Sequence, residues 1–203
     1  MSSFSIVLVL VSFQVFCDGA HAPGRVGYPL HRRSGFPLVR PGEFRVEKRT
    51  AVQQSSCLQA HNDKRALHEG TSSLVWDASL AQQAQKWADH LLALGEMQHS
   101  GTAGQGENLY WGIGSTAASC ADAVEAWYAE IADYDFNNPA FAYNTGHFTQ
   151  VVWKGTTNVG VGIASKKLTS GDYVGMYETY VVARFTPPGN YQGEFAENVG
   201  DVV

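Results

Sequence analysis

The segment Val159-Gly160-Val161-Gly162-Ile163 alternates apolar residues with glycines. Because the side chains of a strand point alternately to its two faces, this pattern predicts a strand with one apolar face and one bare face. A bare face lets another element approach the strand backbone closely. The turn-like residues 169–172 and the Val-, Tyr- and Thr-rich segment Tyr173–Phe185 then predict a hairpin partner, which Pro187-Pro188-Gly189 ends.

Three earlier segments have the periodicity of helices. Ser55 and Ser56 could cap a first helix, and Asp77 is a good N-cap for a second. Ser119 and Asp122 resemble a capping box that opens a third. The residues that repeat at helical spacing are Cys57, Leu58, His61 and Arg65 in the first helix, Leu80, Ala84, Trp87, Leu91 and Leu94 in the second, and Val124, Trp127 and Ile131 in the third.

The order of these patterns indicates an α+β fold. The helical segments come first, the strands come last, and no alternation of single strands with helices is present. Gly146–Trp153 fits either a short fourth helix or a strand, and periodicity does not decide between them.

The first 22 residues predict a secretory signal peptide. A short apolar run, Ile6–Val11 with Phe13–Phe16, precedes the small-residue cleavage signal Ala20-His21-Ala22. The run is shorter than the roughly 20 residues that a membrane span needs, and no later stretch is long enough, so we expect no transmembrane segment. The protein is therefore expected to be secreted and extracellular.

The charge divides the remaining chain in two. Residues 23–49 hold seven Lys or Arg against two Glu, a net charge of +5, and are rich in Pro and Gly. This composition predicts a disordered linker or propeptide, and Lys48-Arg49 at its end is a candidate processing site, with an uncut linker as the alternative. Residues 50–203 carry a net charge of −9. Such an acidic domain could not neutralise phosphates, which excludes nucleic acid as a partner.

Four motifs in the acidic part carry a family resemblance that covers nearly all of residues 52–199. They resemble signatures of the cysteine-rich secretory, antigen 5 and pathogenesis-related (CAP) superfamily, in that family's order. The resemblance implies a three-layer α-β-α sandwich with a central antiparallel sheet, running from about Thr50 to Val199, with the sheet between the first helix and the others. The motifs are His61-Asn62-x-x-Arg65, Gly106-Glu107-Asn108-Leu109, Gly146–Thr156 and Val181–Tyr191.

The chain departs from the family pattern in its cysteines. Ala183 stands where the last signature usually has Cys, and Cys17 would leave with the signal peptide. This poverty in cysteine, and the stretch Trp127–Phe141, are similar to the Golgi-associated plant pathogenesis-related protein 1 subgroup. The two remaining residues, Cys57 and Cys120, are expected to form a disulfide in an oxidising compartment, although their spacing alone does not show that they meet.

In the family two histidines and two glutamates line a central cleft, and the matching residues are His99, Glu107, Glu130 and His147. Imidazole nitrogens with carboxylate oxygens suit Zn²⁺ or another divalent cation, so His99 and His147 are the candidate metal ligands. Each glutamate could instead be a buried hydrogen-bond partner of a histidine.

Other motif residues have plainer interpretations. His61, Arg65 and Asn108 are expected to be structural, the last at a strand end. His68, His90 and His31 have no partner pattern and are expected at the surface. The five tryptophans are expected in the core.

Three classes of function remain open. Relatives in the family bind sterols and other lipids, and the loop residues Phe136, Pro139, Phe141 and Tyr143 are apolar enough to bind a sterol or fatty-acid-like ligand; we therefore expect a lipid-binding or defence-related module. A metal-dependent, protease-like hydrolase would use the same cleft through a metal-activated water, since no serine has a nucleophile-elbow motif. A secreted effector that binds a protein partner is the third class. We expect a binding module more than an enzyme.

Overall fold

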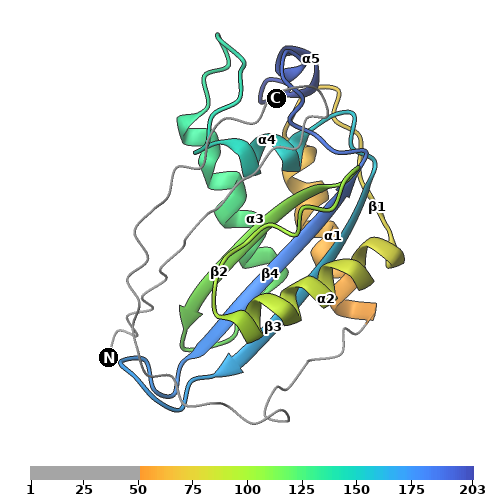
Figure 1. Ribbon diagram of the computed structural model, residues 1–203. Coiled ribbons are helices and arrows are strands. Elements are labelled where there is room, and N and C mark those ends of the chain that lie inside the picture. The colour runs from red at the N-terminus through yellow and green to blue at the C-terminus, as the bar shows by residue number, and fades with distance from the viewer. Residues whose placement is uncertain (1–50) are drawn as a thin grey trace.

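The computed structural model describes residues 51–203, and the expectations for residues 1–22, for residues 23–49 and for Lys48-Arg49 lie outside this range. A four-stranded sheet in the order β1-β3-β4-β2 lies at the centre of the molecule (Figure 1). Its three long strands are antiparallel, and the two-residue β1 joins one edge in parallel. The strands are β1 (Val75–Trp76), β2 (Gly106–Gly114), β3 (Asn158–Lys167) and β4 (Tyr177–Thr186).

The helices form two layers on opposite faces of this sheet (Figure 1), and the expected α+β sandwich is confirmed. One layer is α2 alone. The expectation that the first helix would lie alone is wrong, because α1 packs with α3 and α4 on the other face. The helices are α1 (Ala51–Arg65), α2 (Ala78–Leu94), α3 (Cys120–Tyr128), the 3₁₀ helix η1 (Ala129–Asp133), α4 (Gly146–Val152) and α5 (Phe195–Asn198).

The glycines of β3 explain why α2 has a face to itself. A Cβ at Gly160 would collide with the backbone of Leu80 and Ala81, and one at Gly162 with the backbone of Ala84. The helix therefore lies directly on the bare face of the strand. The close approach predicted by the alternating pattern is confirmed, and α2 is the element that makes it.

Side chains alternate along the strands as the two layers require. Tyr180 and Val182 of β4 pack with α2, whereas Val181 and Ala183 pack with the helices of the other face. β4 is one of the two inner strands, both helix layers pack on it, and eight of its ten residues are buried. It begins at Tyr177 and not at Tyr173, because residues 168–176 form a longer hairpin loop than expected.

Local signals set several element boundaries. Asp77 caps α2 by accepting hydrogen bonds from the backbone of Ser79 and Leu80, and Ser119 with Asp122 forms the predicted capping box of α3. The segment Gly146–Val152 is a helix and not a strand. Helix α1 begins at Ala51, so Ser55 and Ser56 lie inside it. The expectation that all strands come last is also wrong, because β1 and β2 precede α3.

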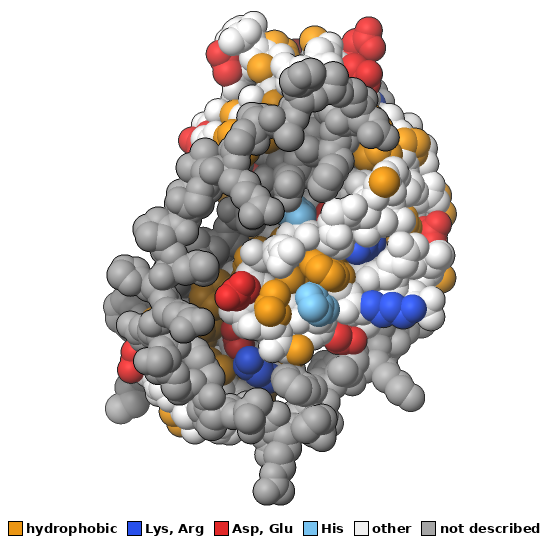
Figure 2. Space-filling model, in the orientation of Figure 1, with side chains coloured by type: hydrophobic (Ala, Val, Ile, Leu, Met, Phe, Trp, Pro, Cys, Tyr) orange, Lys and Arg blue, Asp and Glu red, His pale blue; other side chains and the backbone are white. Residues whose placement is uncertain are grey.

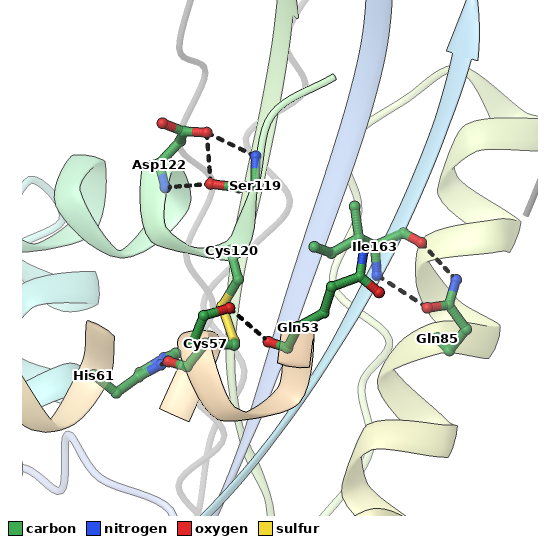
Figure 3. The surroundings of a disulfide bond; sticks show 9 residues. Gln53, Cys57, His61, Gln85, Ser119, Cys120, Asp122 and Ile163 are labelled. Atoms are coloured by element: carbon green, nitrogen blue, oxygen red, sulfur yellow. Dashed lines mark hydrogen bonds between the residues drawn. A yellow bond between two sulfur atoms is a disulfide. The ribbon is translucent and has the colours of Figure 1, made fainter. Parts of the chain in front are cut away.

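A disulfide joins α1 to α3, as expected. Cys57 and Cys120 are bonded across 63 residues of sequence, with their Cα atoms 5.3 Å apart (Figure 3). Trp127 and Trp153 are buried in the same layer, and the other three tryptophans are partly buried. The helix layer that holds both cysteines is therefore fixed by a covalent link as well as by packing.

The surface around α2 is mixed in character. Figure 2 shows acidic, basic and apolar side chains of the described residues interspersed on this face. Within residues 51–203, no helix has the length and apolar character to cross a membrane.

Candidate functional site

The first histidine–glutamate pair joins the chain after α2 to the start of β2. Nδ1 of His99 lies 2.8 Å from Oε1 of Glu107, and the backbone N–H of Ser100 donates to the same oxygen at 2.9 Å. Both side chains of the pair are largely buried. Gly95 ends α2 in the left-handed conformation, with a φ of 74°, and the chain then turns back toward β2.

Arg184 completes the surroundings of Glu107. It lies opposite Glu107 in the β2–β4 register, and its guanidinium is 3.2 Å from Oε2. It also donates to the side chain of Gln105 at 2.9 Å. Burial alone would raise the pKa of Glu107, but the hydrogen bonds from His99 and Ser100 outweigh it and lower that pKa below its usual value. Glu107 is therefore a carboxylate at neutral pH.

The second pair lies between η1 and the start of α4. Nδ1 of His147 is 2.8 Å from Oε1 of Glu130. The other carboxylate oxygen accepts the backbone N–H groups of His147 and Phe148, at 2.9 and 3.1 Å. Thr145, at the N-cap position, makes no side-chain capping bond, so Glu130 satisfies the first turn of α4 in its place.

Asn108 connects the two pairs. It follows Glu107 in β2, is fully buried, and donates from its side-chain nitrogen to the carbonyl of His147 at 3.1 Å. This bond holds the start of α4 against the beginning of β2, so the four predicted residues belong to one region. The side chain of Asn108 joins β2 to α4, which is more than the strand-end role expected for it.

The geometry separates the roles of the four residues. Both glutamates accept hydrogen bonds from a histidine and from backbone N–H groups, and Glu107 also forms an ion pair with Arg184, so the glutamates orient the imidazoles. A histidine whose Nδ1 is bonded to a carboxylate presents Nε2 to a metal, and carboxylate-oriented histidines are common in metal sites. His99 and His147 are therefore of the type that binds a metal, with the glutamates behind them as orienting groups.

A second group of residues that can ligate a metal lies between α1 and α3. One ligand atom each from Cys57, His61 and Cys120 lies within 4.8 Å of the other two. From the sequence, the two cysteines were expected in a disulfide and His61 in a structural role. The helical spacing of Cys57 and His61 is the signal that could have linked them.

The four apolar loop residues do not share one environment. Phe136 belongs to an aromatic cluster, with its ring centroid 4.9 Å from that of Tyr134 and 6.3 Å from that of Phe148. Phe141 packs at 6.4 Å against Phe195 and at 5.3 Å against Tyr143, which is itself 79% exposed. Pro139 is partly buried. The solvent-facing end of the loop is therefore Tyr143 and not Phe136.

Arg65 bonds to backbone carbonyls from its guanidinium. Its guanidinium is fully buried and donates to the backbone carbonyls of Ser72, Val151, Trp153 and Thr156 at 2.7–3.1 Å. It ties the end of α1 to the end of α4, as a structural residue would.

His68 is a buried residue that the sequence analysis expected at the surface. Its two ring nitrogens lie 2.7 Å from the carbonyl of Gly200 and 3.0 Å from the hydroxyl of Tyr128. Burial, the largest influence, lowers its pKa. No local pattern could have shown this, because both partners are distant in sequence.

Comparison with known proteins agrees with this arrangement. The model of the cysteine-rich secretory protein (CAP) family matches residues 58–185, which contain every element from β1 to β3 and most of β4. The chain belongs to the CAP family. Within that match lie both histidine–glutamate pairs and Cys120, and Cys57 immediately precedes it.

Several relatives of this CAP chain are similar over most of its described part. Protein PRY2 of Saccharomyces cerevisiae is 46% identical over 145 residues, covering 71% of this chain and 40% of PRY2. The human Golgi-associated plant pathogenesis-related protein 1 is 39% identical over 147 residues, 70% of this chain and 88% of the relative. Secreted protein RBT4 of Candida albicans is 40% identical over 140 residues, 67% of this chain and 35% of RBT4. The chain thus matches less than half the length of the two fungal proteins.

The fold has solved counterparts. The crystal structure of NaASP2 with Zn²⁺ matches with a TM-score of 0.58 at 21% identity, over 80% of this chain and 90% of that one. At this identity the similarity establishes the CAP fold alone.

Proposed function

We propose that this CAP protein is an extracellular module that binds a sterol or fatty-acid-like ligand at the Phe141–Tyr143 end of the loop before α4. The observation that carries the proposal is an aromatic side chain, Tyr143, that is 79% exposed and touches a second ring, Phe141. An apolar ligand can cover the exposed ring of Tyr143, and the packed ring of Phe141 supports that ring from below.

The anchoring of this loop supports the proposal. Phe136 holds its beginning in the aromatic cluster, and α4 follows its end, with Glu130 fixing the first turn of that helix. A ligand that binds Tyr143 would therefore meet a positioned surface, which reduces the entropy lost on binding. The secreted relative RBT4 supports an extracellular location, and the Golgi-associated human relative is the counter-example.

We further propose that His99 and His147 hold a divalent ion such as Zn²⁺ with their Nε2 atoms. The carboxylate bonds to both Nδ1 atoms support this, and a related fold has been solved with Zn²⁺. Calorimetric titration with Zn²⁺ should show binding that the double variant His99→Ala, His147→Ala loses. Equal heats from both proteins would contradict the ion site.

Capture of a radiolabelled sterol at fixed ionic strength tests the ligand. Removal of a well-buried aromatic contact costs about 1–3 kcal/mol, so Phe141→Ala and Tyr143→Ala should each weaken capture about tenfold or more. Tyr173→Ala is the matched control, because Tyr173 is also exposed but lies in the β3–β4 loop. Unchanged capture in the loop variants would contradict this assignment.

Two other outcomes would replace the proposal. If no lipid is retained and turnover of peptide or ester libraries disappears in Glu107→Gln or Glu130→Gln, the protein is a metal-dependent hydrolase. If neither lipid capture nor turnover is found, the exposed loop serves a protein partner.

A further inference from the structure

The disulfide between α1 and α3 has a histidine beside it. Cys57 and His61 are four residues apart on α1, so they lie on the same side of the helix. A ring nitrogen of His61 and the two sulfurs all lie within 4.8 Å of one another. Figure 3 shows the His61 ring directed toward the disulfide. All three residues are buried.

The hydrogen bonding of His61 determines which of its nitrogens can accept a ligand. Nδ1 lies 2.9 Å from the carbonyl of Cys57. A carbonyl only accepts, so Nδ1 carries the hydrogen and Nε2 carries the lone pair. In the part of the chain described, this buried Nε2 has no hydrogen-bond partner. A histidine that donates one ring N–H to a backbone carbonyl and presents the other nitrogen is typical of metal ligands.

The protonation of His61 agrees with this role. Burial, opposed in part by the hydrogen bond to Cys57, lowers the pKa of His61 to about 4. The imidazole is therefore neutral at physiological pH, and only a neutral imidazole binds a metal.

We propose that a dithiol can reduce the Cys57–Cys120 bond and that the two thiolates with Nε2 of His61 then bind one Zn²⁺. The dithiol supplies two electrons and two protons to the S–S bond and becomes a disulfide itself. Binding of the ion releases both thiol protons. Three protein ligands leave the fourth tetrahedral position to a water.

Charge and ligand type both favour this ion. Two thiolates cancel the charge of Zn²⁺, so the occupied site buries no net charge in the α1–α3 layer. Thiolate ligands favour Zn²⁺ over the harder Mg²⁺ and Ca²⁺. The sulfurs of an intact disulfide are not thiolates, so the site exists only in the reduced protein, and it is separate from the site of His99 and His147.

Cobalt titration tests the proposal, because Co²⁺ that is bound by thiolates shows a sulfur-to-metal charge-transfer band in the near ultraviolet, which Co²⁺ with only nitrogen and oxygen ligands lacks. The disulfide is reduced with a phosphine, the phosphine is removed under anaerobic conditions, and the reduced chain is titrated with Co²⁺. We expect the band to saturate at about one Co²⁺ per chain, with a tetrahedral spectrum that added Zn²⁺ abolishes. The oxidised chain should show no band. Absence of the band in the reduced chain overturns the proposal.

Two variants assign the ligands. His61→Gln should weaken Co²⁺ binding about tenfold or more, as loss of a metal-site contact typically does. His90→Gln, on the exposed side of α2, should leave it unchanged. Equal affinity of His61→Gln and the wild type would contradict a role for His61.

A measurement on the unaltered chain guards against misfolded variants. X-ray absorption of the reduced, zinc-loaded protein should show two sulfurs at about 2.3 Å and nitrogen at about 2.0 Å. A zinc coordination shell that lacks either sulfur or nitrogen would overturn the proposal. So would a coil-like circular dichroism spectrum of the zinc-loaded protein, because the site requires α1 and α3 to be folded together.

Discussion

At the scale of single residues, the candidate site depends on how its carboxylates are used. Glu107 and Glu130 each hold a histidine by Nδ1 and at least one backbone N–H group. A glutamate bound in this way fixes both the direction and the tautomer of its imidazole. The two glutamates therefore influence any ligand through the histidines and not by direct contact.

Replacement of Glu130 tests this role. Glu130→Gln removes the charged acceptor of two N–H groups and of His147, and we expect a loss of about 1–3 kcal/mol in the free energy of unfolding. Urea unfolding measures it. Glu125→Gln is the control, because Glu125 is 66% exposed and its pair with Lys64 contributes little. Equal stability of the two variants would show that Glu130 does not hold α4.

His61 should make the protein sensitive to acid. Its pKa is about 4 in the folded chain and 6.5 when unperturbed, so the unfolded chain binds more protons between these values. The stability contributed by neutral His61 is therefore complete above pH 6.5 and is lost as the pH falls toward 4. The full shift corresponds to about 3 kcal/mol.

Urea unfolding at several pH values measures this loss. His61→Gln should flatten the dependence of unfolding free energy on pH in this interval, whatever its effect on stability at neutral pH. His90→Gln should keep the wild-type slope, because His90 is exposed. A His61→Gln slope equal to that of the wild type would show that another group titrates.

At the scale of elements, the contact of α2 with β3 decides how the sandwich closes. Both glycines of the alternating pattern face the helix, and a side chain at either position would meet helix backbone, which cannot rotate away. Val159 and Val161, which alternate with the glycines, pack into the opposite layer. One strand thus presents bare backbone to α2 on one face and valine side chains to the other helix layer.

Gly162→Val should separate α2 from the sheet. Overpacking in a core lowers the free energy of unfolding by about 1–3 kcal/mol. Because the new side chain would meet helix backbone, we expect the loss for Gly162→Val to lie at or above the upper end of that range. Thermal unfolding should show a lower melting temperature than that of Ser165→Val, a partly buried position of the same strand. Equal melting temperatures would mean that the helix can move without cost.

At the scale of the whole molecule, charge separates the chain into a basic segment and an acidic domain. The basic segment, residues 23–49, has a net charge of +5 and the domain −9, so removal of the segment would change the net charge from −4 for residues 23–203 to −9 for the domain alone. We expect secreted material to lack residues 1–49 through cleavage after Lys48-Arg49. Intact-mass spectrometry of the secreted protein tests this, and a mass that includes residues 23–49 would show an uncut linker.

Much of the fold was predictable from local patterns. The caps at Asp77 and Ser119, the strand around Val161 and the fold class follow from spacing and residue type, because capping and strand alternation act over a few residues. The family motifs also brought together the four residues of the candidate site. Strand β2 was not predicted, and neither was the choice between helix and strand for Gly146–Trp153.

The tertiary structure alone decided which partners meet across long separations. It placed α2, and not α1, alone on one face of the sheet. The glycine face of β3 allows close contact with a helix that has small side chains, and α2 has Ala81, Ala84 and Ala88 there. It buried His68 against Gly200, and it brought His61 to the disulfide. The sequence by itself determined the local elements and their chemistry; the pairing of elements depended on packing contacts that no local pattern records.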